Sequence, residues 1–333
     1  LRLELQAGHT SLLSRPLQSL MREALSRREQ VMLLLNRRGT STVVICRTCG
    51  TAVICPNCDI PLVYHGDRRA LLCHRCDHRE SPHTECRRCG GMLDYFGAGT
   101  QRLEGETRKL FPNARVIRWD QDVARKRSAN SAILQSIERR EVDVIVGTQL
   151  ISKGLDLPYV TAVGIINADI GLHFPDYRAS ERTFQLITQM AGRAGRHTPG
   201  SAVVVQSYTP DHFALQAAQA HDVRRFYGSE IRIREALRYP PFVRMVRYRI
   251  RGETDEGCAA EADDLVRALG RHARGREVPI EVIGPAPAFV ARIRGQHQWH
   301  VILKASVDGL DALLDGLPNS PGWSVDVDPV SLL

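Results

Sequence analysis

Short apolar runs rich in β-branched residues alternate with amphipathic stretches through the first two thirds of the chain. Five runs predict buried strands, at Val31 to Leu35, Ala114 to Trp119, Val142 to Val146, Ala162 to Asn167 and Ala202 to Gln206. The stretches between them predict helices at Gln101 to Leu110, Ser128 to Arg140 and Arg178 to Ala194. This alternation is typical of a parallel sheet flanked by helices, so we expect an α/β fold.

The pattern changes after Ser207. A polar helical connector is expected from Pro210 to Leu237, and the prolines of Tyr239-Pro240-Pro241 cannot continue it. Beyond them, strands are expected at Phe242 to Arg251, Ile280 to Ile283 and His300 to Ala305, and helices at Cys258 to Ala273 and Leu310 to Leu317. These elements predict a small α+β domain. Cys258 stands alone in its helix, which indicates a buried core thiol.

A cysteine-rich segment interrupts the alternation directly after the first strand, so it reads as an insertion. The expected organisation is an α/β lobe formed by residues 1–40 and 92–207, an insertion at 41–91, a connector at 208–237 and an α+β domain at 238–333.

Composition narrows the class of protein. With 333 residues, 43% hydrophobic and 25% charged, the chain can bury more than one core, and no apolar run reaches the length of a membrane span. We therefore expect no membrane partner. The formal net charge of +8 predicts a polyanionic partner. Any single arginine cluster is more often solvated surface, so the chain-wide excess is the better indication.

Eight of the nine cysteines form four Cys-x-x-Cys pairs. Each pair places two thiolates on one tight turn, so one metal ion can join two turns, and four pairs predict two tetrahedral zinc sites. All four ligands of each site come from the protein, which leaves no position for water. We therefore expect structural zinc, which folds a segment too polar to form a core by itself.

Two pairings remain open. The nested one, which the loop lengths favour, groups Cys46, Cys49, Cys86 and Cys89 in one site and Cys55, Cys58, Cys73 and Cys76 in the other. The interleaved one joins the first pair to the third and the second to the fourth. A disulfide framework is the third reading, but a chain of this size does not need covalent cross-links. His65, His74, His78 and His83 are expected to be solvated or to face phosphate.

Two polar blocks of the α/β lobe indicate chemistry. The first, which follows a predicted strand, contains Thr148, Lys153, Gly154 and Asp156; the second, at the end of the long helix, contains Gln189, Gly192, Arg193 and Arg196. We expect both beside the ligand crevice of a parallel sheet. Two guanidinium groups separated by small residues can pair closely with a phosphate. The alternative for the second block is a glycine-containing helix end with surface arginines.

In order and spacing, these blocks resemble motifs V and VI of superfamily 2 helicases. The segment from Asn167 to Gln185 is more specific, as is Asn36-Arg37-Arg38-Gly39, which leads into the cysteine pairs. Together they resemble the PriA family of primosomal replication restart helicases. The resemblance covers nearly the whole chain and is weakest in the last hundred residues or so.

The resemblance implies a RecA-like helicase second lobe with an inserted two-zinc subdomain, followed by a small α+β C-terminal domain. It also implies an ATP-dependent, Mg²⁺-requiring 3′ to 5′ DNA helicase that recognises stalled or branched replication forks and helps to reload the replicative helicase. The implied partners are branched and single-stranded DNA, other primosome proteins and single-stranded DNA-binding protein. The implied location is the cytoplasm, at the nucleoid.

Matching positions receive roles from the same resemblance. Arg193 and Arg196 would face ATP as catalytic arginines, and Gln189 would position them. Gly154 and Asp156 would couple the nucleotide to the DNA path, and Thr148 and Lys153 would contact DNA phosphates. In the last domain, a basic and aromatic group could stack on bases; it comprises Arg292, Arg294, His297, Trp299 and His300. A buried tryptophan is an equal alternative there.

The chain also departs from the family pattern. It contains neither a Gly-x4-Gly-Lys-Ser/Thr phosphate loop nor an Asp-Glu-x-His motif, and it begins at Leu1. We therefore expect the C-terminal half of a longer protein that does not hydrolyse ATP alone. Two other functions remain open: a non-catalytic zinc-containing scaffold that binds forks without an ATPase of its own, and an RNA helicase, because the motor motifs follow backbone phosphates.

Overall fold

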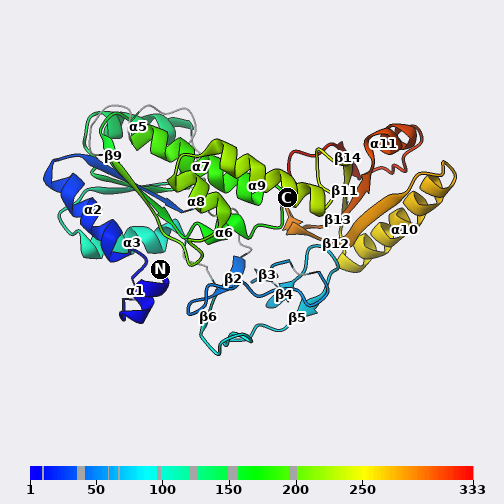
Figure 1. The fold of residues 1–333 in the computed structure, drawn as a ribbon, viewed down its shortest axis with the longest axis horizontal. Helices are drawn as coiled ribbons and strands as arrows, with labels where there is room; N and C mark the ends of the chain where they lie inside the picture. Colours follow the sequence, from blue (N-terminus) through cyan, green and yellow to red (C-terminus); the bar gives the residue numbers. More distant parts are fainter. Residues whose placement is uncertain are drawn as a thin grey trace.

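The computed structural model describes residues 1–9, 11–35, 42–58, 60–66, 68–95, 99–120, 123, 127–148, 157–194 and 201–332. Within these residues the chain forms three sheets. Figure 1 shows an α/β lobe at one end of the molecule, an α+β domain at the other, and the cysteine-rich insertion beneath both. The C-terminus lies between the lobe and the α+β domain.

The lobe is built on a parallel sheet in the order β10-β9-β1-β8-β7. Its strands are β1 (Gln30–Leu35), β7 (Val116–Trp119), β8 (Val144–Gly147), β9 (Val160–Ile166) and β10 (Ala202–Val205). Every residue of β1, β8 and β9 is buried, because helices cover both faces. The five strands predicted from apolar runs are therefore confirmed.

Helices pack on both faces of this sheet (Figure 1). On one face, α2 (Arg15–Ser26) and α3 (Thr100–Leu110) pack against Leu33 and its neighbours. The other face is covered by α5 (Arg127–Glu138), α7 (Ala179–Ala194), α8 (Phe213–Gln219) and α9 (Val223–Ala236). Two short helices, α1 (Arg2–Gln6) and α6 (Asp169–Leu172), complete the lobe. A Cβ atom at Gly164 would lie 2.8 Å from Leu17 Cδ1, so glycine permits the close contact of α2 with β9.

The insertion has a five-stranded sheet in the order β5-β4-β3-β2-β6. Its strands are β2 (Thr42–Cys46), β3 (Val63–His65), β4 (Ala70–Leu72), β5 (Arg79–Glu80) and β6 (Leu93–Tyr95). The first and last strands, β2 and β6, pair antiparallel, so the segment enters and leaves at one place. Its small core consists of a few aliphatic side chains packed around the cysteines.

The α+β domain has a sheet in the order β12-β13-β11-β14. Its strands are β11 (Arg244–Gly252), β12 (Ile280–Ile293), β13 (Gln296–Ala305) and β14 (Ser324–Val327), and the helices α10 (Asp255–Arg274) and α11 (Val307–Leu314) cover one face. The α+β prediction is confirmed. However, β12 runs well beyond the predicted end at Ile283, and β14 was not expected. As predicted, Cys258 is buried in this core.

The last residues of the chain bind back to the lobe. Asp176 accepts hydrogen bonds from the Ser331 hydroxyl (2.8 Å) and the Leu332 backbone (3.1 Å), and Arg182 donates to the Val330 carbonyl at 2.7 Å. These contacts join the α+β domain to the lobe.

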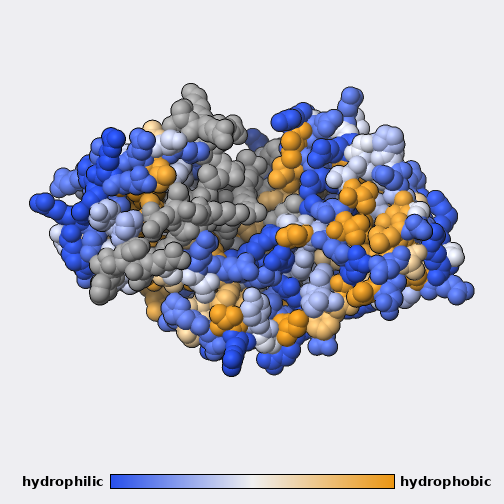
Figure 2. Space-filling model, turned by 90° about the horizontal axis from the view of Figure 1, so that it is seen from above, coloured by the Kyte–Doolittle hydropathy of each residue, from blue (hydrophilic) through white to orange (hydrophobic). Residues whose placement is uncertain are grey.

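Viewed from above, apolar surface gathers mainly over the half of the molecule that holds the α+β domain (Figure 2). Among the described residues, no helix is long and apolar enough to cross a membrane.

Candidate metal centres and the motif-bearing edges of the sheet

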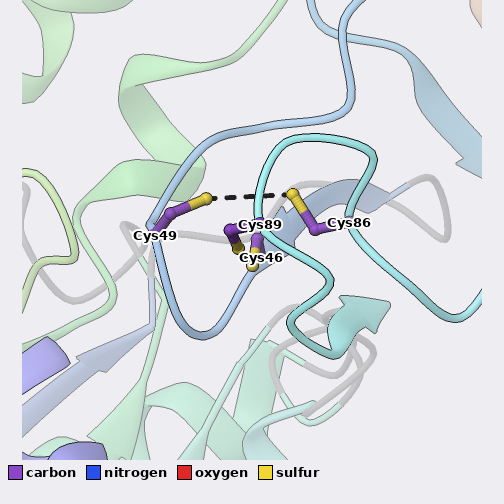
Figure 3. A group of neighbouring side chains, drawn as sticks. All are labelled: Cys46, Cys49, Cys86 and Cys89. Atoms are coloured by element: carbon purple, nitrogen blue, oxygen red, sulfur yellow. Dashed lines mark hydrogen bonds between the residues drawn. The ribbon is translucent and has the colours of Figure 1, made fainter.

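The first cysteine cluster contains Cys46, Cys49, Cys86 and Cys89. Their side chains come from two loops and converge (Figure 3). The Cys49 and Cys86 sulfurs lie 3.8 Å apart, and those of Cys46 and Cys89 lie 3.5 Å apart. All four sulfur atoms lie within 4.8 Å of one another.

The second cluster contains Cys55, Cys58, Cys73 and Cys76, whose four sulfurs also lie within 4.8 Å of one another. The Cys55 and Cys76 sulfurs are 3.7 Å apart. The nested grouping of the four pairs is therefore confirmed, and the interleaved grouping is wrong.

The geometry of both clusters fits a tetrahedral zinc ion. Zinc–sulfur bonds of about 2.3 Å give sulfur–sulfur edges of about 3.8 Å in a regular tetrahedron. The separations of 3.5, 3.7 and 3.8 Å match these edges, and all other sulfur–sulfur separations in each cluster stay within 4.8 Å. Four thiolates complete the coordination, so such an ion would have no open position for substrate or water. Both sites are suited to holding the insertion together rather than to catalysis.

Local turns place the thiolates of each pair. Gly50 donates its backbone N–H to the Cys46 carbonyl at 2.9 Å, and Gly90 donates to the Cys86 carbonyl at 2.8 Å. Both glycines have positive φ, +72° and +69°. Glycine adopts this conformation without the strain that a Cβ atom brings. In the second cluster Asp77 occupies the same kind of position, with φ of 55°. The sequence therefore turns sharply after each of these pairs.

Without metal, the thiols of a cluster do not all ionise readily. Burial, together with the neighbouring Cys76 thiol, raises the pKa of Cys58 to about 11. Burial acts in the same direction on Cys49, but hydrogen bonds with Thr51 outweigh it and lower the pKa of Cys49 to about 6. A bound cation would supply the positive charge that keeps four adjacent thiolates deprotonated.

Two histidines of the insertion are buried, which contradicts the prediction that they are solvated or face phosphate. His65 and His74 are 3% and 4% exposed. The His74 Nδ1 donates to the Pro287 carbonyl at 2.7 Å, and the His300 Nε2 donates to the His74 carbonyl at 2.8 Å. His74 and His300 therefore join the insertion to the α+β domain. None of the four insertion histidines belongs to a described metal-binding group.

Trp299 is buried as well, at 4% exposed, and its indole N–H donates to Asp255 at 2.9 Å. The proposed stacking of Trp299 on bases is therefore wrong, because its ring lies in the core behind α10. His300, the next residue of β13, points to the other face and is buried against His74 of the insertion. Only the hairpin end of that group, which includes Arg292 and Arg294, is exposed. Arg294 as a DNA contact stays a prediction.

Most arginines of the insertion contact other residues of the same chain, either in the α+β domain or within the insertion. Arg68 pairs with Asp255 at 2.8 Å, and Arg75 approaches Glu281 at 3.4 Å, so both bind the α+β domain. Arg79 pairs with Asp77, Arg87 with Glu80, and Arg88 donates to Thr51. Sequence reasoning missed Asp255 and Glu281 as partners because they are distant along the chain and no local pattern marks them.

The two motif blocks are described only in part. Thr148 is half-buried directly after β8, and Gln189 is exposed on α7. Arg193 is in α7, but its side chain lies outside the described residues, as do Lys153, Gly154, Asp156 and Arg196. A Cβ atom at Gly192 would meet nothing within 4 Å, so packing does not require glycine there.

We expected both blocks just after strand ends, but among the described residues only the start of block one lies there. Thr148 follows the carboxyl end of β8, whereas the last turn of α7 lies beside Ser201, which precedes β10. The reason is topological, since α7 connects two parallel strands and must run antiparallel to them. Leu157, the first described residue after block one, already precedes the amino end of β9. Leu157 and the described end of α7 therefore both precede the amino ends of the neighbouring strands β9 and β10.

Residues between the two blocks form hydrogen bonds that hold the lobe together. Asp169 is fully buried and accepts hydrogen bonds from Ser207, Tyr208 and Thr209. Glu181 accepts from Arg178 at 2.7 Å and from Arg234 at 2.5 Å, which joins α7 to α9. Burial acts against ionisation, but these two arginines hold the pKa of Glu181 below its usual value.

Family models match three parts of the chain. They are the "Primosomal protein N C-terminal domain" over residues 235–330, the "PriA DNA helicase Cys-rich region (CRR) domain" over residues 55–81 and the "Helicase conserved C-terminal domain" over residues 93–198. The lobe is thus of the helicase C-terminal type, with a cysteine-rich insertion and a further α+β domain.

Curated relatives match along nearly the whole chain. "Replication restart protein PriA" of Synechocystis sp. is 39% identical over 100% of this chain and 41% of its own length. The protein of the same name from Bacillus subtilis is 39% identical over 91% of this chain and 38% of its own length. The chain therefore spans about two fifths of the length of these relatives. A solved Pyrococcus furiosus Hef helicase domain aligns with a TM-score of 0.29 and 16% identity, covering 58% of this chain and 24% of that chain. That likeness is too weak to support a conclusion.

Proposed function

The chain belongs to the family of the replication restart protein PriA, and on that premise we propose that it forms the second motor lobe, the zinc insertion and the C-terminal domain of an ATP-dependent DNA helicase. The helicase translocates 3′ to 5′, recognises stalled or branched replication forks and helps to reload the replicative helicase. The helicase C-terminal match supports this, because residues 93–198 include both motif blocks.

The observation that carries the proposal is that the described residues next to the two blocks lead into neighbouring strands of one parallel sheet. Leu157, next to the end of block one, precedes β9, and the last turn of α7 lies beside Ser201, which precedes the neighbouring β10. Leu157, which follows block one, and the last described turn of α7 thus belong to connections that enter two neighbouring strands of one sheet. A motor lobe needs such an arrangement, because its nucleotide contacts and its DNA contacts must move together.

In this function the second block acts on the nucleotide. Arg193 and Arg196 face ATP held by another lobe, and Gln189 positions them. ATP with Mg²⁺ supplies the phosphoryl group that is transferred to water. Two guanidinium groups near the γ-phosphate stabilise the charge that develops on its oxygens.

The first block acts on DNA and on the coupling between the two ligands. Thr148, which is half-buried at the carboxyl end of β8, and Lys153 contact backbone phosphates. Gly154 and Asp156 connect those contacts to the nucleotide. The net charge of +8 supports a polyanionic partner.

The insertion binds two structural Zn²⁺ ions, one in each four-cysteine cluster. The sulfur–sulfur separations support this occupancy. The further partners that fit the function are branched and single-stranded DNA, other primosome proteins and single-stranded DNA-binding protein. The site of action is the cytoplasm, at the nucleoid.

The test uses the full-length product of the gene that encodes this chain. Arg196→Ala should lower DNA-stimulated ATP hydrolysis by about 10³-fold or more, while DNA affinity stays near that of the unaltered protein. Arg139→Ala, at an exposed position after α5, is the control and should change neither quantity. Unchanged hydrolysis in Arg196→Ala would remove the catalytic role. A full-length product without a phosphate loop would instead support the fork-binding scaffold.

A further inference from the structure

A cavity of about 730 Å³ opens at the amino ends of β1, β7 and β8. It lies between the ends of α2, α3 and α5, in the half of the molecule away from the α+β domain (Figure 1). Its lining combines apolar side chains with arginines. We call the apolar group, Leu25, Leu110, Phe111, Pro112 and Val142, the floor, and the arginines, Arg22, Arg28, Arg115 and Arg140, the rim. We call this cavity the arginine groove.

Only one of the four rim arginines is neutralised by a carboxylate among the described residues. Arg115 forms a two-pronged pair with Asp143, with N–O distances of 2.7 and 2.9 Å. Arg22 donates to the Gln18 side-chain oxygen at 3.0 Å. Arg140 donates to the Arg28 carbonyl at 2.5 Å.

The Arg28 guanidinium has neither a hydrogen-bond nor an ion-pair partner in the part of the chain that the structure describes. The groove therefore presents three positive charges that form no ion pair among the described residues, those of Arg22, Arg28 and Arg140; Glu29 acts on Arg140 only from a distance.

Two of these arginines occupy backbone positions that favour glycine. Arg28 and Arg140 have φ of 58° and 59°, each two residues beyond the end of a helix. Glycine commonly ends a helix in this left-handed conformation, because a Cβ atom is strained there. The bond from Arg140 to the Arg28 carbonyl gives Arg140 a structural use. The side chain of Arg28 has none among the described residues, so a ligand would explain its presence.

We propose that the arginine groove binds an acidic segment of a partner protein, whose carboxylates pair with the unpaired arginines and whose apolar side chains lie on the floor. A guanidinium group matches a carboxylate with two parallel hydrogen bonds, and clusters of arginine are a recurrent means of recognising acidic motifs. The charge of the rim selects an acidic partner, and the apolar floor adds burial that a purely electrostatic contact lacks.

A nucleic acid fits the groove less well. A phosphate backbone gains nothing from an apolar floor, and bases need an exposed ring on which to stack. Phe111, the aromatic residue of the lining, is only 8% exposed, and Arg22 lies 6.0 Å from its ring centre. The groove lies at the amino ends of the strands, whereas Thr148 follows the carboxyl end of β8. A segment bound in the groove would therefore leave Thr148 accessible.

The experiment measures binding of a fluorescein-labelled pool of eight-residue peptides, in which Asp or Glu alternates with Leu, Ile or Phe, to the whole chain. Arg28→Gly and Arg22→Gln are the test variants. Glycine suits the φ of residue 28, so the first variant removes the charge without straining the fold. The control is Arg267→Gln, which removes an equal charge from the exposed face of α10. Thermal unfolding checks the fold of each variant.

We expect saturable binding that weakens about tenfold or more in each test variant and is unchanged in the control. A second pool, with Ser in place of the apolar residues, should bind about tenfold more weakly or worse. The proposal is overturned by the absence of saturable binding, by an equal loss in Arg267→Gln, or by equal affinity for the Ser pool. It is also overturned if single-stranded DNA loses as much affinity in Arg28→Gly as the acidic pool does, which would make the groove a nucleic-acid site.

Discussion

Arg68 of the insertion donates a hydrogen bond to Asp255 of the α+β domain at 2.8 Å, across 187 positions of sequence. The same carboxylate oxygen accepts the Trp299 indole N–H at 2.9 Å. Burial opposes ionisation of Asp255, but these two donors hold its pKa below the usual value. Asp255 is therefore one of the points at which the insertion is fixed to the α+β domain, beside the contacts of His74 and Arg75.

Replacing Asp255 with Asn should destabilise this junction by about 1–2 kcal/mol, because the variant removes the negative charge from a partly buried ion pair. A double-mutant cycle with Arg68→Met isolates the energy of the pair, and urea unfolding measures it. Asp264→Asn is the matched control on the same helix. Its pair with Arg267 is exposed, so its loss should change stability by less than about 0.5 kcal/mol. Equal effects of the two substitutions would show that the junction pair adds no stability.

Alanine at Gly50 should destabilise the insertion more than alanine at Gly90. Both glycines have positive φ, so both variants incur strain of about 1 kcal/mol. At Gly50, a Cβ atom would also lie 2.9 Å from Tyr208 Cβ and 3.0 Å from the Tyr208 carbonyl oxygen, whereas at Gly90 it meets nothing within 4 Å. Overpacking of this kind costs about 1–3 kcal/mol more. Thermal unfolding of both variants checks the order, and a larger loss at Gly90 would contradict it.

Removal of one cysteine should remove one metal ion. Cys49→Ser leaves three thiolates in the first cluster, so we expect zinc content to fall from two equivalents to one, with the second cluster still loaded. Cys258→Ala is the control, since Cys258 lies in the core of the α+β domain and should leave two equivalents. Elemental analysis by plasma mass spectrometry gives the count. One equivalent in the unaltered chain, or iron in place of zinc, would contradict the assignment.

The elements of the lobe and the nested clusters could be predicted because their signals are local. An apolar run such as Val142 to Val146 marks a strand buried on both faces, and Cys-x-x-Cys spacing marks a metal-binding turn. The strands β12 and β13 are longer than predicted because they form one hairpin, closed by a two-residue turn at Arg294-Gly295 with φ of 51° and 85°. That turn signal lay within reach of the sequence.

The contacts between domains could not be predicted in the same way. Trp299 and His300 resemble a nucleic-acid surface in sequence, yet β13 turns one toward α10 and the other toward His74. The exposure of a polar or aromatic residue depends on which domain packs against its strand, and no local pattern records that choice. Likewise, the orientation of α7, and with it the position of block two, follows from parallel strand order rather than from its own residues.

Acidification should reveal the titration of His212. Burial, with a further contribution from His173, lowers the pKa of His212 to about 4, whereas the unfolded chain titrates near 6.5. Between these values the unfolded state binds more protons than the folded state, so stability should fall as pH drops from 6.5 toward 4. The expected loss at pH 5.5 is about 1 kcal/mol.

The variant that tests this keeps the helix cap and removes the titration. The His212 Nδ1 accepts the Ala214 N–H at 3.2 Å as the N-cap of α8, and the side-chain oxygen of Asn can accept the same bond without gaining a proton. In urea unfolding at pH 7 and pH 5.5, His212→Asn should lose about 1 kcal/mol less than the unaltered chain, because the titrating groups that do not interact with His212 are shared and cancel in the comparison. Parallel losses would mean that His212 keeps an ordinary pKa in the folded protein, and that its burial beside His173 does not oppose protonation.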